Sequence, residues 1–224
     1  MTADRVSDEA APPRLGRWIG YMVAGESLGF LVPVTGFALA ATLGLQAWSA
    51  WALLVVMGAG EGALLGLGQS LALRGSSAAV PVGRWVAATT VAASVAWSIG
   101  MLPPTLNDLG IGIDWGSPVT WTVAGVAALV LLATIPVAQW PVLAGSVPRA
   151  WRWIPLNMGA WLVGLVFTFL PSPLIDESTP GWITFALFAV GGVLMATTVA
   201  VLTGLGLRRM SRREAVVTRA ARRL

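Results

Sequence analysis

The chain has 224 residues, of which 56% are hydrophobic and 11% are charged, and its formal net charge is +4. A soluble domain usually carries about 25% charged residues, so this composition excludes a disordered chain, a collagen-like fibre and an ordinary water-soluble enzyme. The sequence contains no Cys, no His and no Lys. Disulfides, thiolate metal sites, Ser-His-Asp catalysis and Schiff-base chemistry are therefore excluded, and we expect no metal and no cofactor.

Six stretches are long and apolar enough to cross a bilayer, for which a helix needs roughly 20 apolar residues. The sequence therefore predicts an all-α membrane protein with six transmembrane helices, at about 18–44, 48–72, 85–103, 119–143, 153–171 and 182–206. Residues 1–15 are polar and contain Pro, which is typical of a short disordered tail rather than of a signal peptide. We expect a transmembrane domain over residues 16–207 and a basic tail over residues 208–224.

The distribution of Arg predicts the orientation of the spans. Arg residues precede the first span, flank the loops after the second and fourth spans, and follow the sixth span. The alternate loops carry no basic residue and contain the acids Asp108, Asp114, Asp176 and Glu177. Because cytoplasmic loops are enriched in Lys and Arg, we expect both termini to be cytoplasmic. The bias toward Ala, Gly, Val and Arg without Lys suggests a GC-rich bacterial genome, and we expect the protein in a bacterial inner membrane.

Many of the twelve Trp residues fall near the ends of the predicted spans. Trp is amphipathic and favours the headgroup level of a bilayer, so we interpret these residues as aromatic belts, with a Trp-lined ligand box as the alternative. The predicted cytoplasmic belt contains Trp18, Trp85, Trp140, Trp151 and Trp153, and the predicted outer belt contains Trp48, Trp51, Trp115, Trp121 and Trp182.

The sequence contains an internal threefold repeat. An Arg-Trp pair opens each copy, and the pairs Arg17-Trp18, Arg84-Trp85 and Arg152-Trp153 are spaced by 67 and 68 residues. Later in the copies, Gln69 and Leu73 match Gln139 and Leu143, and Gly66-Leu67-Gly68 recurs as Gly204-Leu205-Gly206. Repeats of the same orientation imply a rotation axis along the membrane normal. The pattern predicts a quasi-threefold bundle of three tandem helical hairpins, at about 16–82, 83–150 and 151–213.

The Arg-Trp pairs have an ordinary explanation in the bilayer. Arg side chains extend toward lipid phosphates while Trp anchors the interface. We therefore interpret all six residues of these pairs as interface anchors. Binding of a substrate by Arg84 or Arg152 is the alternative.

The same motifs carry a resemblance. Gln139-Trp140 with Leu143, followed by Arg152-Trp153-Ile154, resembles an uncharacterised family of small multi-pass bacterial membrane proteins with a Gln-Trp-x-x-Leu segment before an Arg/Trp-rich helix start. In the preceding copy Ser70 stands where that pattern has Trp. The resemblance covers about residues 58–165 and implies an architecture but no activity.

Two acidic residues lie inside the predicted membrane. Glu61 lies 13 residues from both Trp48 and Arg74, which places it roughly 20 Å from each edge of the bilayer. Glu26 shares one helical face with Gly29, Pro33 and Gly36, a face suited to a packed interior. Because a tight turn joins the first two spans, the two carboxyls should lie about 6 Å apart in depth.

These acids are costly and break the repeat. An acid at the bilayer centre costs about 2.5–3.5 kcal/mol. The copies of Glu26 are Ala93 and Trp161, and those of Glu61 fall near Val130 and Leu202, so the fold itself does not require the acids. One hypothesis is a proton or cation site in which the two acids share a proton. The alternatives are a neutral, hydrogen-bonded Glu pair that joins the first two spans, and a contact with a lipid headgroup or a partner.

Other polar and small residues in the spans favour helix packing. Gly58, Gly62 and Gly66 form a small-residue ridge that permits close helix approach. Gln69, Gln139 and Asn157 are candidates for interhelical hydrogen bonds in the membrane interior, although solvent contact is the simpler expectation for the two Gln residues near the cytoplasmic ends.

The tail after the sixth span contains seven Arg and one Glu, a composition that favours binding to anionic lipids, with docking of a cytoplasmic protein as the alternative. We expect no binding to nucleic acid. The sequence as a whole favours a non-enzymatic accessory or scaffold subunit that contacts the lipid bilayer and a membrane-protein partner or a second copy of itself. A small transporter or channel-like protein that uses Glu61 and Glu26 is the alternative.

Overall fold

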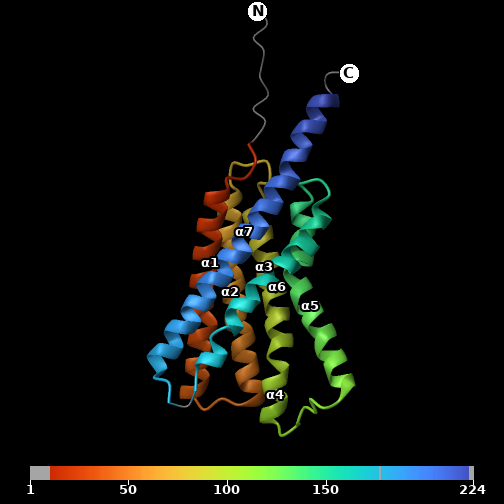
Figure 1. The fold of residues 1–224 in the computed structure, drawn as a ribbon. Helices are drawn as coiled ribbons and strands as arrows, with labels where there is room; N and C mark the ends of the chain where they lie inside the picture. Colours follow the sequence, from red (N-terminus) through yellow and green to blue (C-terminus); the bar gives the residue numbers. More distant parts are fainter. Residues whose placement is uncertain (1–10, 177, 222–224) are drawn as a thin grey trace, which may run out of the picture.

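A computed structural model describes residues 11–176 and 178–221, with side chains up to Ser211. The predicted tail over residues 1–15 lies mostly outside the described residues. The described part of the chain forms helices and turns without a strand (Figure 1). The α-helices are α1 (Leu15–Thr42), α2 (Ala47–Leu73), α3 (Val82–Gly100), α4 (Leu102–Asp108), α5 (Pro118–Leu143), α6 (Trp153–Phe169) and α7 (Gly181–Ala221), and the short 3-10 helices are η1 (Ala150–Arg152) and η2 (Ser172–Leu174).

Six helical segments are long and apolar enough to cross a membrane, as the sequence predicted. Their outer faces carry exposed large apolar side chains, including Leu31, Val56, Val91, Val123, Val163 and Phe185, one from each of the long helices. Such continuous apolar exposure is expected where helices face lipid instead of water. The all-helical fold is therefore confirmed, and the six long apolar helices are compatible with an integral membrane protein.

The six long helices form a closed ring in chain order. Neighbours along the chain pack against each other from α1 to α2, α3, α5, α6 and α7, and α7 packs back against α1. Each helix runs antiparallel to the one before it (Figure 1). The ring therefore consists of the hairpins α1–α2, α3–α5 and α6–α7, and the last hairpin closes against the first.

Glycines set the distance between neighbouring helices in the first half of the ring. A Cβ on Gly68 of α2 would lie 2.5 Å from the carbonyl oxygen of Tyr21 in α1, and a Cβ on Gly25 would lie 2.9 Å from the carbonyl oxygen of Leu64. On the other side of α2, a Cβ on Gly62 would overlap Ala93 of α3. The predicted ridge of Gly58, Gly62 and Gly66 therefore lies where α2 packs against α3.

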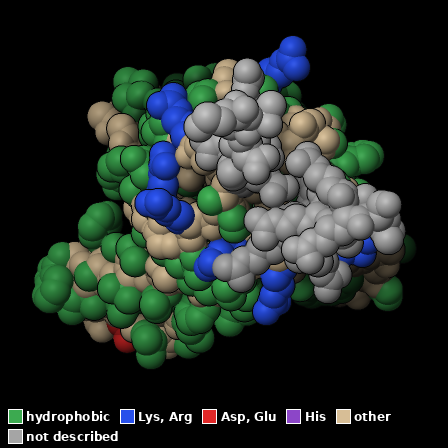
Figure 2. Space-filling view, turned by 90° about the horizontal axis from the view of Figure 1, so that it is seen from above, with side chains coloured by type: hydrophobic (Ala, Val, Ile, Leu, Met, Phe, Trp, Pro, Cys, Tyr) green, Lys and Arg blue, Asp and Glu red, His purple; other side chains and the backbone are tan. Residues whose placement is uncertain are grey.

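Arg residues gather at the end of the bundle where α1, α3 and α6 begin, which we call the Arg end. Figure 2 shows their side chains on this end, which also carries the two ends of the described chain, Ala11 and Ala221 (Figure 1). The described part of α7 extends from the bundle here as far as Ala221. The tail predicted over residues 208–224 thus starts as a continuation of the sixth span, while its side chains after Ser211 lie outside the described residues.

The opposite end of the bundle carries the acidic loops. Asp108 accepts a hydrogen bond from the backbone N–H of Ala47, at the start of α2, at 3.1 Å. Hydrogen bonds from the Ser178 hydroxyl, the Thr179 hydroxyl and the Ser178 backbone N–H lower the pKa of Asp176 below its usual value. Asp176 therefore stays ionised at neutral pH, and the charge difference between the two ends predicted from the sequence is present in the fold.

Candidate functional site

Three Trp residues form a buried layer near the Arg end. Trp18, Trp85 and Trp153 are each at most 1% exposed. The Trp153 ring contacts the other two, edge-on to Trp18 with centroids 6.1 Å apart and tilted against Trp85 at 6.3 Å. The prediction that these three residues anchor the protein in the lipid interface is therefore wrong for their side chains. The Trp rings point into the bundle, where they pack against one another and their N–H groups find acceptors that lipid tails do not offer.

Each indole of this Trp layer is hydrogen-bonded to the helix that precedes it in the ring. The acceptor lies on α2 for Trp85, on α5 for Trp153 and on α7 for Trp18. The three bonds are Trp85 Nε1 to Gln69 Oε1 at 3.0 Å, Trp153 Nε1 to Gln139 Oε1 at 2.9 Å, and Trp18 Nε1 to the Thr203 hydroxyl at 3.2 Å. One such bond therefore crosses each of the three junctions between hairpins.

The two Gln residues join these junctions into a network. Gln139 Nε2 donates to Gln69 Oε1 at 2.8 Å and to the Thr89 hydroxyl at 2.9 Å. Gln69 and Gln139 are at most 1% exposed, so the expected solvent contact is wrong and the predicted interhelical hydrogen bonds are confirmed. The network satisfies polar groups that would be costly to bury alone.

The Arg partners of the Trp layer remain at the surface of the Arg end. Arg17 donates to the carbonyl oxygens of Leu71 at 2.7 Å and Arg74 at 3.1 Å, and thereby caps the end of α2. Arg84 is exposed. Arg152 lines a groove with Arg209. These positions do not test the predicted role of the Arg side chains as interface anchors, so that role stays a prediction.

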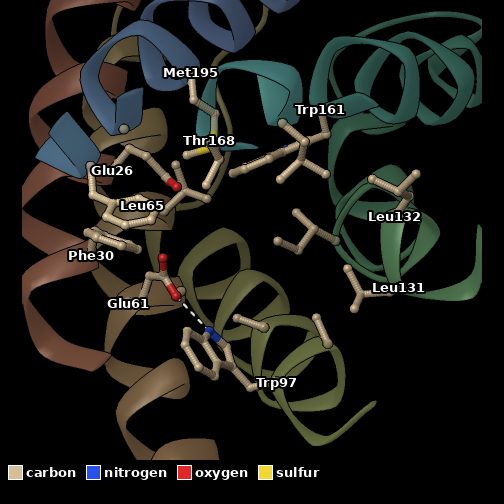
Figure 3. A pocket seen from close by; sticks show the side chains of 17 residues that line it. Glu26, Phe30, Glu61, Leu65, Trp97, Leu131, Leu132, Trp161, Thr168 and Met195 are labelled. Atoms are coloured by element: carbon tan, nitrogen blue, oxygen red, sulfur yellow. Dashed lines mark hydrogen bonds between the residues drawn. The ribbon is translucent and has the colours of Figure 1, made fainter. Parts of the chain in front are cut away.

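A cavity of about 260 Å³ lies deeper in the bundle than the Trp layer. All six long helices contribute to its wall, which is apolar except for a few groups. Figure 3 shows Glu26 and Glu61 reaching toward it from α1 and α2, with Trp97 and Trp161 among the other side chains that line it. Of the lining residues, Glu26 and Glu61 alone carry an ionisable side chain. The structure thus brings the two predicted acids to one site.

Glu26 is the more deeply buried of the two acids. Its side chain is 3% exposed, and its Oε2 atom is buried without a hydrogen-bond partner among the described residues. It lies on the buried face of α1 together with Gly29, Pro33 and Gly36, as predicted. A buried carboxyl oxygen without a partner is costly, so this atom is the strongest indication of a ligand.

Glu61 is half-buried and has a protein partner. Its Oε2 accepts a hydrogen bond from Trp97 Nε1 of α3 at 2.6 Å. A Cβ added to Gly29 of α1 would lie 3.3 Å from the Cγ atom of Glu61. Gly29 itself lies about one helical turn along α1 from Glu26. The two carboxyls therefore occupy neighbouring levels of the cavity. The hydrogen bond of Glu61 joins α2 to α3 and not to α1. The hydrogen-bonded Glu pair that was one alternative for these acids is therefore not formed among the described residues.

Asn157 is fully buried on α6, between Trp153 and Trp161 in the sequence. Neither its Nδ2 nor its Oδ1 has a hydrogen-bond partner among the described residues. The interhelical hydrogen bond expected for this residue is therefore not made.

Sequence reasoning missed Trp97 and Trp161, which line the cavity. A signal was available, because these are the two Trp residues that fall in neither of the predicted interface belts. A Trp far from both interfaces needs a partner for its N–H group, and for Trp97 that partner is Glu61.

The comparisons with known proteins found no matching family model, no matching curated protein and no matching solved structure. The resemblance to a family of small bacterial membrane proteins therefore remains a hypothesis. The described residues contain no group of three or more His, Cys, Asp or Glu side chains able to hold a metal ion. The cavity and its two carboxyls are consequently the features of the molecule that indicate a function.

Proposed function

We propose that the protein is a non-enzymatic transporter of the bacterial inner membrane, in which Glu26 and Glu61 form a proton or cation site. The observation that carries this proposal is the buried, unpartnered Oε2 atom of Glu26 in an otherwise apolar cavity that it shares with Glu61. Acids within membrane spans cost free energy and mark ion or proton pathways. A bound cation would supply the missing partner, and a bound proton would remove the charge of the buried carboxyl.

The proposal includes the orientation of the molecule. The Arg end would face the cytoplasm, because loops rich in Arg are retained on that side of a membrane. The acidic loops that contain Asp108, Asp114 and Asp176 would then face outward. Both termini would be cytoplasmic, and the Arg-rich end of α7 would lie beside the anionic lipids of the inner leaflet.

We also propose that the three hairpins are related by quasi-threefold symmetry. The three hydrogen bonds of the Trp layer support this, because each joins the start of one hairpin to the return helix of the preceding one. The same symmetry relates residues of the cavity wall, which lie eight positions along each helix from the hydrogen-bonded side chains of the Trp layer. Eight positions after each Trp, the outgoing helices carry Glu26, Ala93 and Trp161. Eight positions before each acceptor, the return helices carry Glu61, Leu131 and Met195, and all six residues line the cavity. One of the three equivalent positions on the outgoing helices and one of the three on the return helices are thus acidic.

The return helix of the third repeat fits this symmetry when Thr203 is aligned with Gln69. This alignment differs from the one that the glycine match in the sequence indicated. If Thr203 takes the place of Gln69, then Leu207 takes the place of Leu73, and both leucines are at most 1% exposed. The glycine match between Gly66 and Gly204 is displaced by one helical turn from this alignment. The indole contacts are the stronger guide, because they arise from packing and not from composition.

The test is ion flux through proteoliposomes that contain the purified protein. Wild-type protein should carry protons or a monovalent cation down an imposed gradient, and Glu61→Gln should abolish that flux at unchanged thermal stability. Gln keeps the shape and an oxygen acceptor for Trp97, but it does not ionise. Asp114→Asn, which removes a carboxyl from an outer loop, is the matched control and should leave the flux unchanged.

The alternative function is an accessory or scaffold subunit without a substrate of its own. Absence of flux in wild-type protein under every imposed gradient would favour that role. Flux that survives both Glu61→Gln and Glu26→Gln would preserve transport but remove the carboxyls from its mechanism.

A further inference from the structure

We propose that the cavity between the six helices binds a small organic monocation, an ammonium group attached to an apolar body. This inference rests on the proposed function, because it uses the same two carboxyls. It names the class of cation from the shape and chemistry of the wall.

The charges in the cavity favour a single positive charge. Glu61 already has a hydrogen bond from Trp97, whereas Glu26 Oε2 has no partner among the described residues. No basic side chain lines the cavity. Two carboxylates that face one apolar space repel each other, so one proton on either carboxyl and one bound cation would neutralise the pair.

The wall favours an organic cation over a bare metal ion. Hard metal ions such as Ca²⁺ and Mg²⁺ require about six or more oxygen ligands. Besides the two carboxyls, Thr168 is the hydroxyl residue of the wall, and its hydroxyl is directed to the sulfur of Met195 at 3.1 Å. An ammonium ion with apolar substituents needs few oxygen ligands and gains from contact with apolar surface.

Aromatic side chains complete the site. Phe30, Trp97, Trp161 and Phe188 line the same cavity as the carboxyls, from α1, α3, α6 and α7. Aromatic faces attract cations, with Trp the strongest of the three ring types, and this combination recurs where proteins bind quaternary ammonium groups.

The size of the cavity sets the size of the ligand. A dry apolar cavity of about 150 Å³ admits benzene. The cavity here is about 260 Å³, which leaves room for a ring with a trimethylammonium group attached. Benzyltrimethylammonium is therefore a suitable probe, and neopentylbenzene is its neutral isostere, with carbon in place of nitrogen.

The experiment is a calorimetric titration of the full-length protein in mild detergent. Wild-type protein should bind benzyltrimethylammonium saturably, at one site per chain and at least tenfold more tightly than neopentylbenzene. Glu26→Gln should weaken binding of the cation at least tenfold, and Asp114→Asn should leave it unchanged. Trp161→Leu, which keeps both carboxyls, should weaken binding of the cation several-fold.

The comparison of the two probes in wild-type protein needs no variant, so it decides the question even if Glu26→Gln fails to fold. Absence of binding, or equal affinity for the cation and its neutral isostere, would overturn the inference. If flux nevertheless depends on Glu61, the proposed function survives and only the choice of cation is wrong. If the cation binds selectively but no flux is found, the proposed transport fails while the binding site stands.

Discussion

Gln139 makes three side-chain hydrogen bonds in the buried network near the Arg end, to Trp153, Gln69 and Thr89. Gln139→Leu keeps the volume but leaves the Trp153 indole and the Thr89 hydroxyl without this partner. We expect the free energy of unfolding to fall by about 1–2 kcal/mol, since interhelical hydrogen bonds in membranes contribute at most this much. Thermal or denaturant unfolding in detergent measures the change.

Thr35→Val is the matched control for this substitution, because it also replaces a polar side chain by an apolar one. Thr35 is exposed on α1, and its hydroxyl is bonded only to the Leu31 carbonyl of the same helix. This variant should unfold like the wild type. Equal losses of stability in the two variants would show that the Gln network does not hold the hairpins together.

Single residues also show which features of the structure could not be predicted from the sequence. The sequence predicted that Trp18, Trp85 and Trp153 belong to a repeat and lie near one end of the bundle. It also predicted that their rings face the lipid interface, which is wrong. Hydropathy and the Trp preference for interfaces give the depth of a residue, and they do not give the side of the helix that faces the bundle. The partners Gln69, Gln139 and Thr203 lie on other helices, so the burial depends on contacts that a linear pattern does not contain.

At the scale of elements, α1 and α2 approach each other closely at Gly68, where the facing atoms belong to the backbone. The Cβ added by Gly68→Ala would meet the Tyr21 carbonyl oxygen at 2.5 Å and the Gly25 Cα at 3.3 Å. Backbone atoms do not rotate away as a side chain does, so the two helices must separate. We expect a destabilisation of about 1–3 kcal/mol, measured by thermal unfolding in detergent.

The control is Gly20→Ala, which adds the same methyl group on α1. A Cβ at Gly20 would meet no atom within 4 Å. Since Ala favours the helix over Gly, this variant should be as stable as the wild type or slightly more stable. A loss of stability at Gly20 as large as that at Gly68 would contradict the packing explanation.

The spans themselves were the most predictable elements. Six predicted stretches correspond to six observed apolar helices, because bilayer thickness fixes both the length and the composition of a span. The short helix α4 after Met101 was not expected. Its seven residues include two prolines near the start, and apolar character alone does not separate it from the end of the third span.

At the scale of the whole molecule, the ring of helices explains how two acids on one hairpin reach a cavity lined by all three. Each hairpin contributes an outgoing and a return helix, and the last hairpin closes on the first. The sequence predicted the hairpins but not the cavity, because the rest of the wall comes from residues distant in the sequence such as Trp161 and Met195. Only the closure of the ring brings those residues together.

The orientation of this ring is the last prediction, and the cysteine-free sequence makes it direct to test. Ala79 and Ala144 are exposed in loops at the Arg end, while Gly112 and Ser172 are exposed at the opposite end. Single Cys residues at Gly112 and Ser172 should react with a membrane-impermeant maleimide on intact cells. Those at Ala79 and Ala144 should react only after the cells are permeabilised, because Arg-rich loops stay in the cytoplasm.

These four positions allow clean labelling. Ser76 and Ser146, in the same loops at the Arg end, bond to the carbonyl oxygens of Leu73 and Ala79, so a Cys at either would disturb its loop. Labelling of intact cells at Ala79 and Ala144, with protection at Gly112 and Ser172, would invert the molecule. Glu26 and Glu61 lie in the interior of the bundle in either orientation, so such a result would reverse the direction of access to the cavity and leave the carboxyl site itself unaffected.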